Sequence, residues 1–126
     1  MVPVAFCESK EYNDQLRTTM KMDEFVDACE QGDKLLYLKD WHLVKEFSSP
    51  SVYQLPMYFC EDWINDFWDY ESIEGQESDD YRFVYIGMKG SFTPLHKDVF
   101  RSYSWSTNIS GTKKWYFIGN SYLNLN

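Results

Sequence analysis

A series of short, strand-like segments in residues 82–119 most constrains what this chain can fold into. The segments read RFVYIGM, TPLHKDVF, SYSWSTNIS and KKWYFIG, and glycines at 87, 90 and 111 punctuate them. Strands that follow one another so closely predict an antiparallel sheet, a barrel or a jelly roll. A complete jelly roll has about eight strands and needs more chain than this stretch provides.

Residues 1–81 show a mixed pattern that precedes the strands. Residues 1–17 suggest a strand or an extended lead-in, followed by a polar loop. TTMKMDEFVDACEQGD has the apolar spacing of an amphipathic helix, with Thr18 or Thr19 as its cap and Gly32 at its end. LLYLKDW (35–41) predicts a buried strand, CEDWINDFWDY a second helix, and ESIEGQESDD a solvated acidic loop. The fold class expected is α+β or mainly β.

Composition limits the classes of partner. The chain has 126 residues and a formal net charge of −8, which argues against nucleic-acid binding. Three isolated cysteines predict reduced thiols rather than a disulfide framework. The sequence shows no signal peptide and no apolar run long enough to span a membrane. We therefore expect a cytoplasmic protein, with a nuclear location as the alternative.

The segment TPLHKDVF holds the strongest chemical pattern. Residues i and i+2 of a strand share a face, so His96 and Asp98 project together while Lys97 points away. An imidazole nitrogen and a carboxylate so placed can bind one divalent ion, and a second histidine would complete the facial triad of a non-haem Fe(II) oxygenase. The alternative is an ordinary polar patch. A lysine at 113 could pair with a dicarboxylate cosubstrate, or simply be solvated.

Taken together, these motifs resemble the jumonji-C family. The run DDYRFVYIGMKGSFTPLHKDVFRSYSWSTNISGTKKWYF has the HxD pair, a Trp-Ser pair nine and ten residues after the histidine, and G-x-K before Trp115, in that order. The resemblance extends to VPVAFCESKEYN, LLYLKDWHL and FCEDWINDFWDYE. It implies a cupin-type double-stranded β-helix, a jelly roll, and a protein hydroxylase that uses Fe(II) and 2-oxoglutarate.

The resemblance also implies roles for individual residues. His96 and Asp98 would be iron ligands, and Lys113 would pair with the distal carboxylate of 2-oxoglutarate. Tyr37 and Thr93 match positions that hydrogen-bond that carboxylate in related hydroxylases. Ser106 stands where many relatives have a cosubstrate-contacting asparagine. The implied substrate is a protein, with a lysine of the eukaryotic translation termination factor as the specific expectation.

The chain departs from the family pattern at the third iron ligand. The family's second histidine lies downstream of the G-x-K-x-W segment, and no histidine follows it here. The other histidine, His42, is interpreted as a hydrogen-bonded packing residue. The expected organisation is a partial jumonji-C domain, with a helical and strand lead-in (1–81), the first strands of the β-helix (82–119) and a divergent tail (120–126). Whether it is an enzyme, a non-enzymatic truncated binding module or an unrelated β-rich binding domain remains open at this point.

Overall fold

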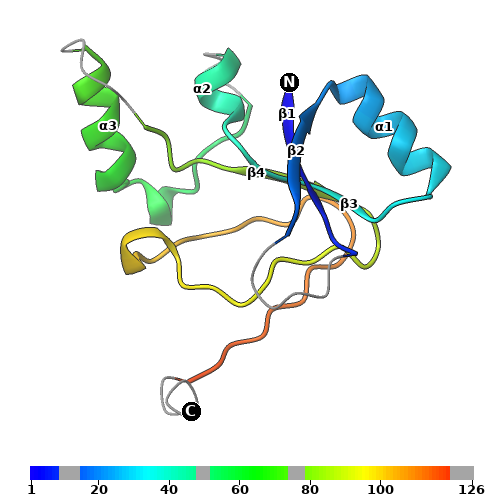
Figure 1. The fold of residues 1–126 in the computed structure, drawn as a ribbon. Helices are drawn as coiled ribbons and strands as arrows, with labels where there is room; N and C mark the ends of the chain where they lie inside the picture. The colour runs from blue at the N-terminus through cyan, green and yellow to red at the C-terminus, as the bar shows by residue number, and fades with distance from the viewer. Residues whose placement is uncertain (9–14, 48–51, 74–78, 120–126) are drawn as a thin grey trace.

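A four-stranded antiparallel sheet forms the centre of the computed structural model, which describes residues 1–8, 15–47, 52–73 and 79–119 (Figure 1). The strand order is β2-β1-β3-β4, and every neighbouring pair is antiparallel. The strands are β1 (Val2–Phe6), β2 (Arg17–Met20), β3 (Leu36–Trp41) and β4 (Val84–Gly87). The helices are α1 (Met22–Gln31), α2 (Leu43–Phe47) and α3 (Trp63–Ile73), with short 3₁₀ turns η1 (Met57–Phe59) and η2 (Val99–Arg101). The expectations of an antiparallel sheet and of a buried strand at 35–41 are confirmed.

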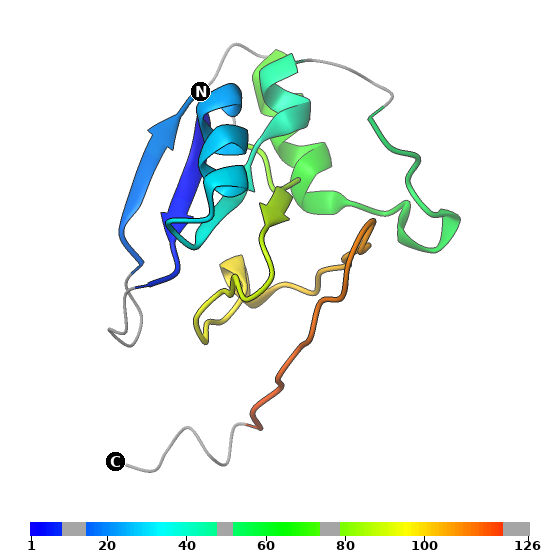
Figure 2. The same ribbon diagram turned by 90° about the vertical axis from the view of Figure 1, so that its right-hand side faces the viewer.

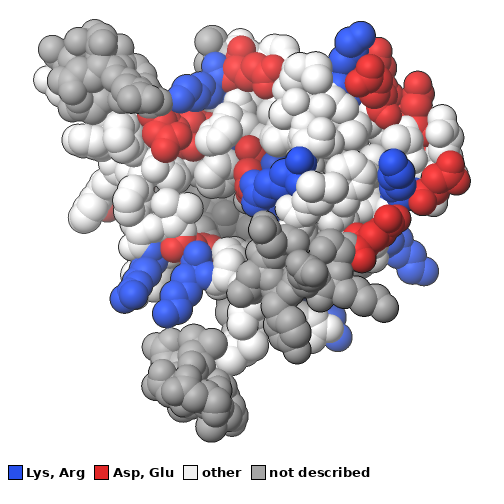
Figure 3. All heavy atoms as spheres, viewed as in Figure 1, with Lys and Arg blue, Asp and Glu red and all other residues white. Residues whose placement is uncertain are grey.

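Helix α1 covers one face of the inner strands β1 and β3 (Figures 1 and 2). Its apolar stripe contributes Phe25, which is 2% exposed. The core comprises apolar side chains that alternate along the two strands, together with this phenylalanine: Val2, Val4, Phe25, Leu36, Leu38 and Trp41. The outer surface of α1 carries acidic side chains (Figure 3). The core therefore lies between α1 and the sheet, and the opposite face of the sheet is left for residues 88–119.

The ends of α1 confirm one expectation and correct another. Gly32 ends the helix in the left-handed conformation, with φ 71°, as the sequence predicts. Thr18 and Thr19 do not cap its start, because both belong to β2 and pair with β1. The backbone N–H of Lys21 instead donates to Glu24 Oε2 at 3.0 Å. The short polar strand β2 has no apolar alternation, which is why the sequence pattern did not indicate it.

Only the first of the four strands expected in residues 82–119 forms. It is β4, which pairs with β3 across the boundary at residue 82. The expected strands at 93–100, 102–110 and 113–119 are wrong, because these segments have no ladder partner among the described residues. Several of their large side chains are not covered: Tyr103 and Ile109 are fully exposed, and the last residues up to 119 run away from the sheet (Figure 2). The expected tail at 120–126 lies outside the described residues.

Helix α3 confirms the helix expected in CEDWINDFWDY. Trp63 and Phe67 are 77% and 54% exposed, so its aromatic face is only partly covered. Asn65 is buried, and its Oδ1 accepts the backbone N–H of Tyr81 at 2.8 Å, which ties α3 to the residues before β4. No helix in the described parts of the chain combines the length and the apolar character needed to cross a membrane.

Strand β3 contains a bulge at Asp40. Leu38 pairs with Ile86 and Trp41 with Val84, so two residues of β3 stand opposite the single residue Tyr85. Asp40 has φ 61°, an uncommon value for a residue other than glycine. Its two oxygens are held from either side, since Oδ2 accepts from Arg17 Nη1 at 3.0 Å and Oδ1 from Tyr85 Oη at 2.9 Å. The bulge moves Trp41 to the same face as Leu38 and into the core.

The acidic stretch at 71–80 is not simply a solvated loop. Its first residues end α3, and residues 74–78 lie outside the described residues. Asp80 is 3% exposed, with Oδ2 at 3.2 Å from His42 Nδ1 and Oδ1 at 3.4 Å from Arg82 Nη1. His42 also packs edge-on against Phe83, at 5.0 Å between ring centroids. The prediction of a solvated loop is therefore wrong for Asp80, whose carboxylate is buried between His42 and Arg82. The interpretation of His42 as a hydrogen-bonded packing residue is confirmed.

Removal of the Asp80 carboxylate is expected to destabilise the fold much more than removal of Asp69, which pairs with the same Arg82 from an exposed position. Asp80→Ala removes a buried carboxylate that contacts both His42 and Arg82 and should lower the free energy of unfolding by about 3 kcal/mol. Asp69→Ala should cost less than about 1 kcal/mol, because exposed ion pairs contribute little. Urea unfolding of both variants provides the comparison. Equal costs would contradict a central role for Asp80.

Candidate functional site

The His96 and Asp98 side chains converge in the loop between β4 and η2. His96 Nε2 lies 3.4 Å from Asp98 Oδ1. His96 Nδ1 lies 2.8 Å from the carbonyl oxygen of Pro94, which can only accept, so the proton of the neutral ring is on Nδ1. The lone pair of Nε2 is thereby left facing the carboxylate. A nitrogen and an oxygen donor stand side by side, as the sequence predicts for this pair.

The convergence arises from a turn and not from strand alternation. Asp98 precedes η2 with φ −61° and ψ 154°, and Phe100 and Arg101 both have φ 54°. Two consecutive non-glycine residues in the left-handed region are uncommon and tend to occur at functional sites. Ser104 Oγ donates to Asp98 Oδ2 at 2.7 Å, which orients the carboxylate and leaves Oδ1 toward the histidine.

The pair is open to solvent and has two protein donors. The side chains of His96 and Asp98 are 51% and 44% exposed. Within residues 1–8, 15–47, 52–73 and 79–119, no group of three or more His, Cys, Asp or Glu side chains is arranged to hold a metal ion. The only other histidine of the sequence, His42, is engaged with Asp80. Among the described residues, the pair therefore offers one nitrogen and one oxygen donor without a third at its side.

Tyr37 and Thr93, both predicted to bind the cosubstrate, lie together on the face of the sheet opposite α1. Tyr37 is 7% exposed and forms a side-chain hydrogen bond with Thr93. Burial raises the pKa of the Tyr37 phenol, and the Thr93 hydrogen bond acts in the other direction. Gly87 pairs directly with Tyr37 in β4. A Cβ on that glycine would clash with Ser91 Oγ and would lie 2.8 Å from Tyr37 Cδ2, so the glycine leaves room for both side chains.

Lys113, the third predicted cosubstrate residue, joins the same cluster through Tyr85. Its Nζ lies 5.1 Å from the centroid of the Tyr85 ring and 4.4 Å from that of Trp115. Burial lowers the pKa of Lys113. The Tyr85 ring in turn lies 6.0 Å from the Tyr37 ring. The structure thus places Tyr37 and Lys113 each next to Tyr85.

Tyr85 is held by Asp40 and responds to the charge of Asp98. Burial raises the pKa of Tyr85 well above its usual range, and the charges of Asp40, which accepts its hydroxyl, and of Asp98 act in the same direction. Asp98 is therefore close enough to influence the phenol electrostatically. The sequence reasoning did not identify Tyr85. The available signal was strand alternation, since Tyr85 and Gly87 share a face of β4 and Gly87 pairs with Tyr37.

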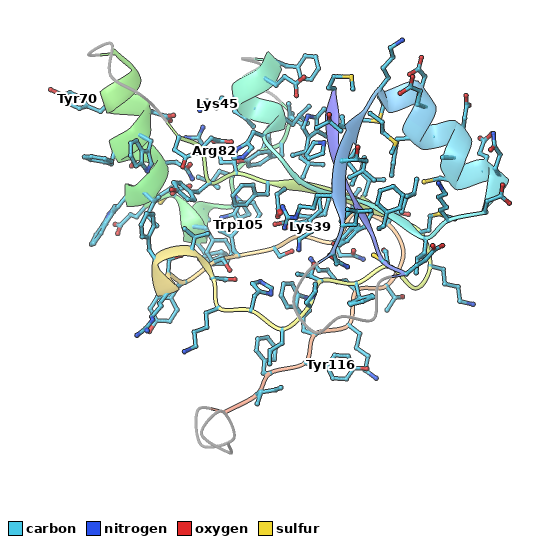
Figure 4. The ribbon with its side chains drawn as sticks, in the orientation of Figure 1. Lys39, Lys45, Tyr70, Arg82, Trp105 and Tyr116 are labelled. Carbon is cyan, nitrogen blue, oxygen red and sulfur yellow. The ribbon has the colours of Figure 1, made fainter. Side chains whose placement is uncertain are left out.

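Ser106 is not brought to the cluster. It is exposed and forms no hydrogen bond with a described residue. Its neighbour Trp105 stacks on Phe59, with 5.7 Å between ring centroids, and lies on the side of the sheet away from α1 (Figure 4). A role for Ser106 in cosubstrate binding stays a prediction.

Comparison with known proteins gives a consistent result. Residues 83–124 match the family model described as "JmjC domain, hydroxylase". The chain is 48% identical over 122 residues to the 2-oxoglutarate and iron-dependent oxygenase JMJD4 of Danio rerio, covering 90% of this chain and 28% of that protein. It is 48% identical over 123 residues to JMJD4 of Gallus gallus, covering 91% of this chain and 28% of that protein.

A relative with a different name is equally similar. The Arginine-specific demethylase JMJ20 of Arabidopsis thaliana is 47% identical over 131 residues, covering 93% of this chain and 28% of that protein. The chain therefore spans about 28% of the length of these curated relatives. No solved structure matches it significantly.

The packing of Tyr37 on Gly87 can be tested with a double-mutant cycle. Gly87→Ala should lower the free energy of unfolding by about 1–3 kcal/mol, because the added methyl group displaces the Tyr37 ring. In a Tyr37→Ala background the ring is absent and only the clash with Ser91 Oγ remains, so the same substitution should cost less. Urea unfolding of the four proteins measures the coupling. Identical costs in both backgrounds would show that the ring is not what the glycine accommodates.

Proposed function

We propose that this chain, a member of the JmjC family, carries the iron-binding pair and the 2-oxoglutarate site of a protein oxygenase. It spans about 28% of the length of the curated relatives named above. The observation that carries the proposal is the convergence of His96 Nε2 and Asp98 Oδ1, 3.4 Å apart, beside the cluster of Tyr37, Thr93 and Lys113. The sheet would then be part of a cupin-type double-stranded β-helix.

The donor set of the pair fits Fe(II). One imidazole nitrogen and one carboxylate oxygen are two of the three ligands of the facial triad in non-haem Fe(II) oxygenases. His96 and Asp98 would hold the ion, with Pro94 and Ser104 orienting them through their outer hydrogen bonds. Bound Fe(II) together with 2-oxoglutarate supplies the oxidising chemistry of such enzymes.

The cluster around Tyr85 fits a dicarboxylate. The ammonium group of Lys113 would pair with the distal carboxylate of 2-oxoglutarate, and the hydroxyl groups of Tyr37 and Thr93 would donate hydrogen bonds to it. The rings of Tyr85 and Trp115 hold the lysine by cation–π contacts before any ligand arrives. Such preorganisation lowers the entropic cost of binding.

The proposed substrate is a protein. The relatives named JMJD4 are 2-oxoglutarate and iron-dependent oxygenases, and the matching family model is described as a hydroxylase. We propose lysyl hydroxylation of the eukaryotic translation termination factor as the specific activity, in the cytoplasm or also in the nucleus. The similarity to the Arginine-specific demethylase JMJ20 makes oxidation of an arginine N-methyl group the second candidate. A net charge of −8 suits a basic substrate segment in either case. A non-enzymatic JmjC binding module is the alternative that lacks turnover.

Metal binding tests the pair directly. We expect the 126-residue chain to bind Mn(II), a spectroscopic substitute for Fe(II), weakly and without turnover of 2-oxoglutarate. His96→Ala and Asp98→Ala should each weaken binding by at least about tenfold. Lys97→Ala, the matched control between them, should not. Electron paramagnetic resonance, which detects free Mn(II), measures the affinity of the wild type and of the three variants for the ion.

Two outcomes would contradict these expectations. If His96→Ala bound Mn(II) as tightly as the wild type, the pair would not be the metal site. If the wild type released succinate and the His96→Ala variant did not, two protein ligands would suffice for turnover, and the binding-module alternative would be wrong.

Cosubstrate binding tests Lys113 separately from the metal. Lys113→Met should weaken 2-oxoglutarate binding by about tenfold, since it removes a charge-assisted contact, and should leave Mn(II) binding unchanged. Lys114→Met is the matched control, because Lys114 lies over Tyr116 at 5.0 Å and outside the cluster. Isothermal titration calorimetry measures the affinity for Mn(II) first, and then the affinity for 2-oxoglutarate with Mn(II) present. Equal losses in the two variants would indicate a nonspecific charge effect.

A further inference from the structure

Lys39 is a buried lysine on the face of the sheet that carries the proposed 2-oxoglutarate site. It lies two residues after Tyr37 in β3, and therefore on the same face as that tyrosine. At the bulge it stands, with Asp40, opposite Tyr85. Lys39 is only 9% exposed, and its side chain lies below β3, on the side away from α1 (Figure 4). A cation is thus enclosed beside the two tyrosines that flank the proposed site.

The charge of Lys39 has no counterion among the described residues. It forms no hydrogen bond with any of them and no ion pair within 4.0 Å. The adjacent Asp40 is committed elsewhere, since its two oxygens accept from Arg17 and Tyr85. Burial lowers the pKa of Lys39, the charge of Asp40 opposes that shift and the charge of Arg17 adds to it. A buried cation without a partner destabilises the folded protein.

Long aliphatic stems often cover apolar surface while the charged group reaches water, and this is the simplest structural role for a lysine. Two features indicate more than that. The stem is on the side of the tyrosines rather than in the core under α1. The ammonium group is also not among the fully enclosed side-chain atoms that lack a hydrogen bond, which in the described residues are Gln15 Oε1 and Asp80 Oδ1. It therefore remains accessible to a small anion.

We propose that Lys39 is a second cationic contact for a dicarboxylate bound against the Tyr37 face of the sheet. The inference rests on the proposed function, in which 2-oxoglutarate occupies this face beside Lys113. The two lysines approach from different parts of the chain, Lys39 from β3 and Lys113 from the segment after Gly111. Both lysines would contact the distal carboxylate, whose two oxygens can each accept from one ammonium group and which a monocarboxylic 2-oxo acid lacks. Lys39 thus acts as a determinant of selectivity for a dicarboxylic 2-oxo acid.

The test compares Lys39→Met, Lys39→Arg and the exposed control Lys89→Met in the 126-residue chain with Mn(II) present. Calorimetry measures binding of 2-oxoglutarate and of 2-oxobutanoate, a monocarboxylate 2-oxo acid. Lys39→Met should weaken 2-oxoglutarate binding by about tenfold and change 2-oxobutanoate binding by less than about twofold. Lys39→Arg should retain most of the affinity for 2-oxoglutarate, and Lys89→Met all of it.

Thermal unfolding separates this role from a structural one. Replacement of a buried, unpaired cation by methionine should leave the unfolding temperature unchanged or raise it, while ligand binding weakens. Wild-type affinity of Lys39→Met for 2-oxoglutarate would overturn the inference and leave the proposed function intact. So would a parallel loss of both ligands together with a lower unfolding temperature. Absence of 2-oxoglutarate binding by the wild type would overturn the proposed function itself, and this inference with it.

Discussion

The bulge at Asp40 determines which side chains of β3 face the core and which face the proposed site. Without the extra residue, Trp41 would share a face with Tyr37 and leave the core under α1. With it, Leu38 and Trp41 both pack beneath the helix, while Tyr37 and Lys39 stay on the other face. The conformation of Asp40 is unfavourable in isolation, and the hydrogen bonds from Arg17 and Tyr85 compensate for it. The Asp40 carboxylate therefore links β2, β3 and β4, and it holds the bulge that sets which side chains of β3 lie on each face of the sheet.

Local patterns in the sequence were sufficient for the elements that carry their own signal. The apolar spacing of α1, its end at Gly32 and the apolar run of β3 all predicted what the structure contains. The later strand predictions failed because strand-like composition produces a strand only where another strand offers a free edge, and segments 93–100, 102–110 and 113–119 pair with none of the described residues. The polar edge strand β2 was missed for the converse reason, since it forms through pairing with little apolar content.

The residues of the proposed site could be predicted from the sequence, but the contacts that hold them together could not. His96, Asp98, Tyr37, Thr93 and Lys113 were identified from motifs and family resemblance, and the structure brings the last three together and pairs the first two. Tyr85 and Asp40 were missed, although they hold the site together. Their contact joins residues 45 positions apart, and it depends on the register of β3 with β4. Such long-range pairing leaves no signal in any short window of the sequence.

The exposure of the His96–Asp98 pair has a kinetic consequence. About half of each side chain is open to solvent, so an ion bound there keeps direct contact with water on its unprotected side. Its dissociation would require only the loss of two ligands and no opening of the fold, because neither donor is covered by a described element. Exchange of the ion with the surrounding medium would then be fast, and occupancy would follow the free metal concentration closely. The proposed metal site would then behave as a surface equilibrium, whereas Tyr37, at 7% exposure, is fixed within the sheet.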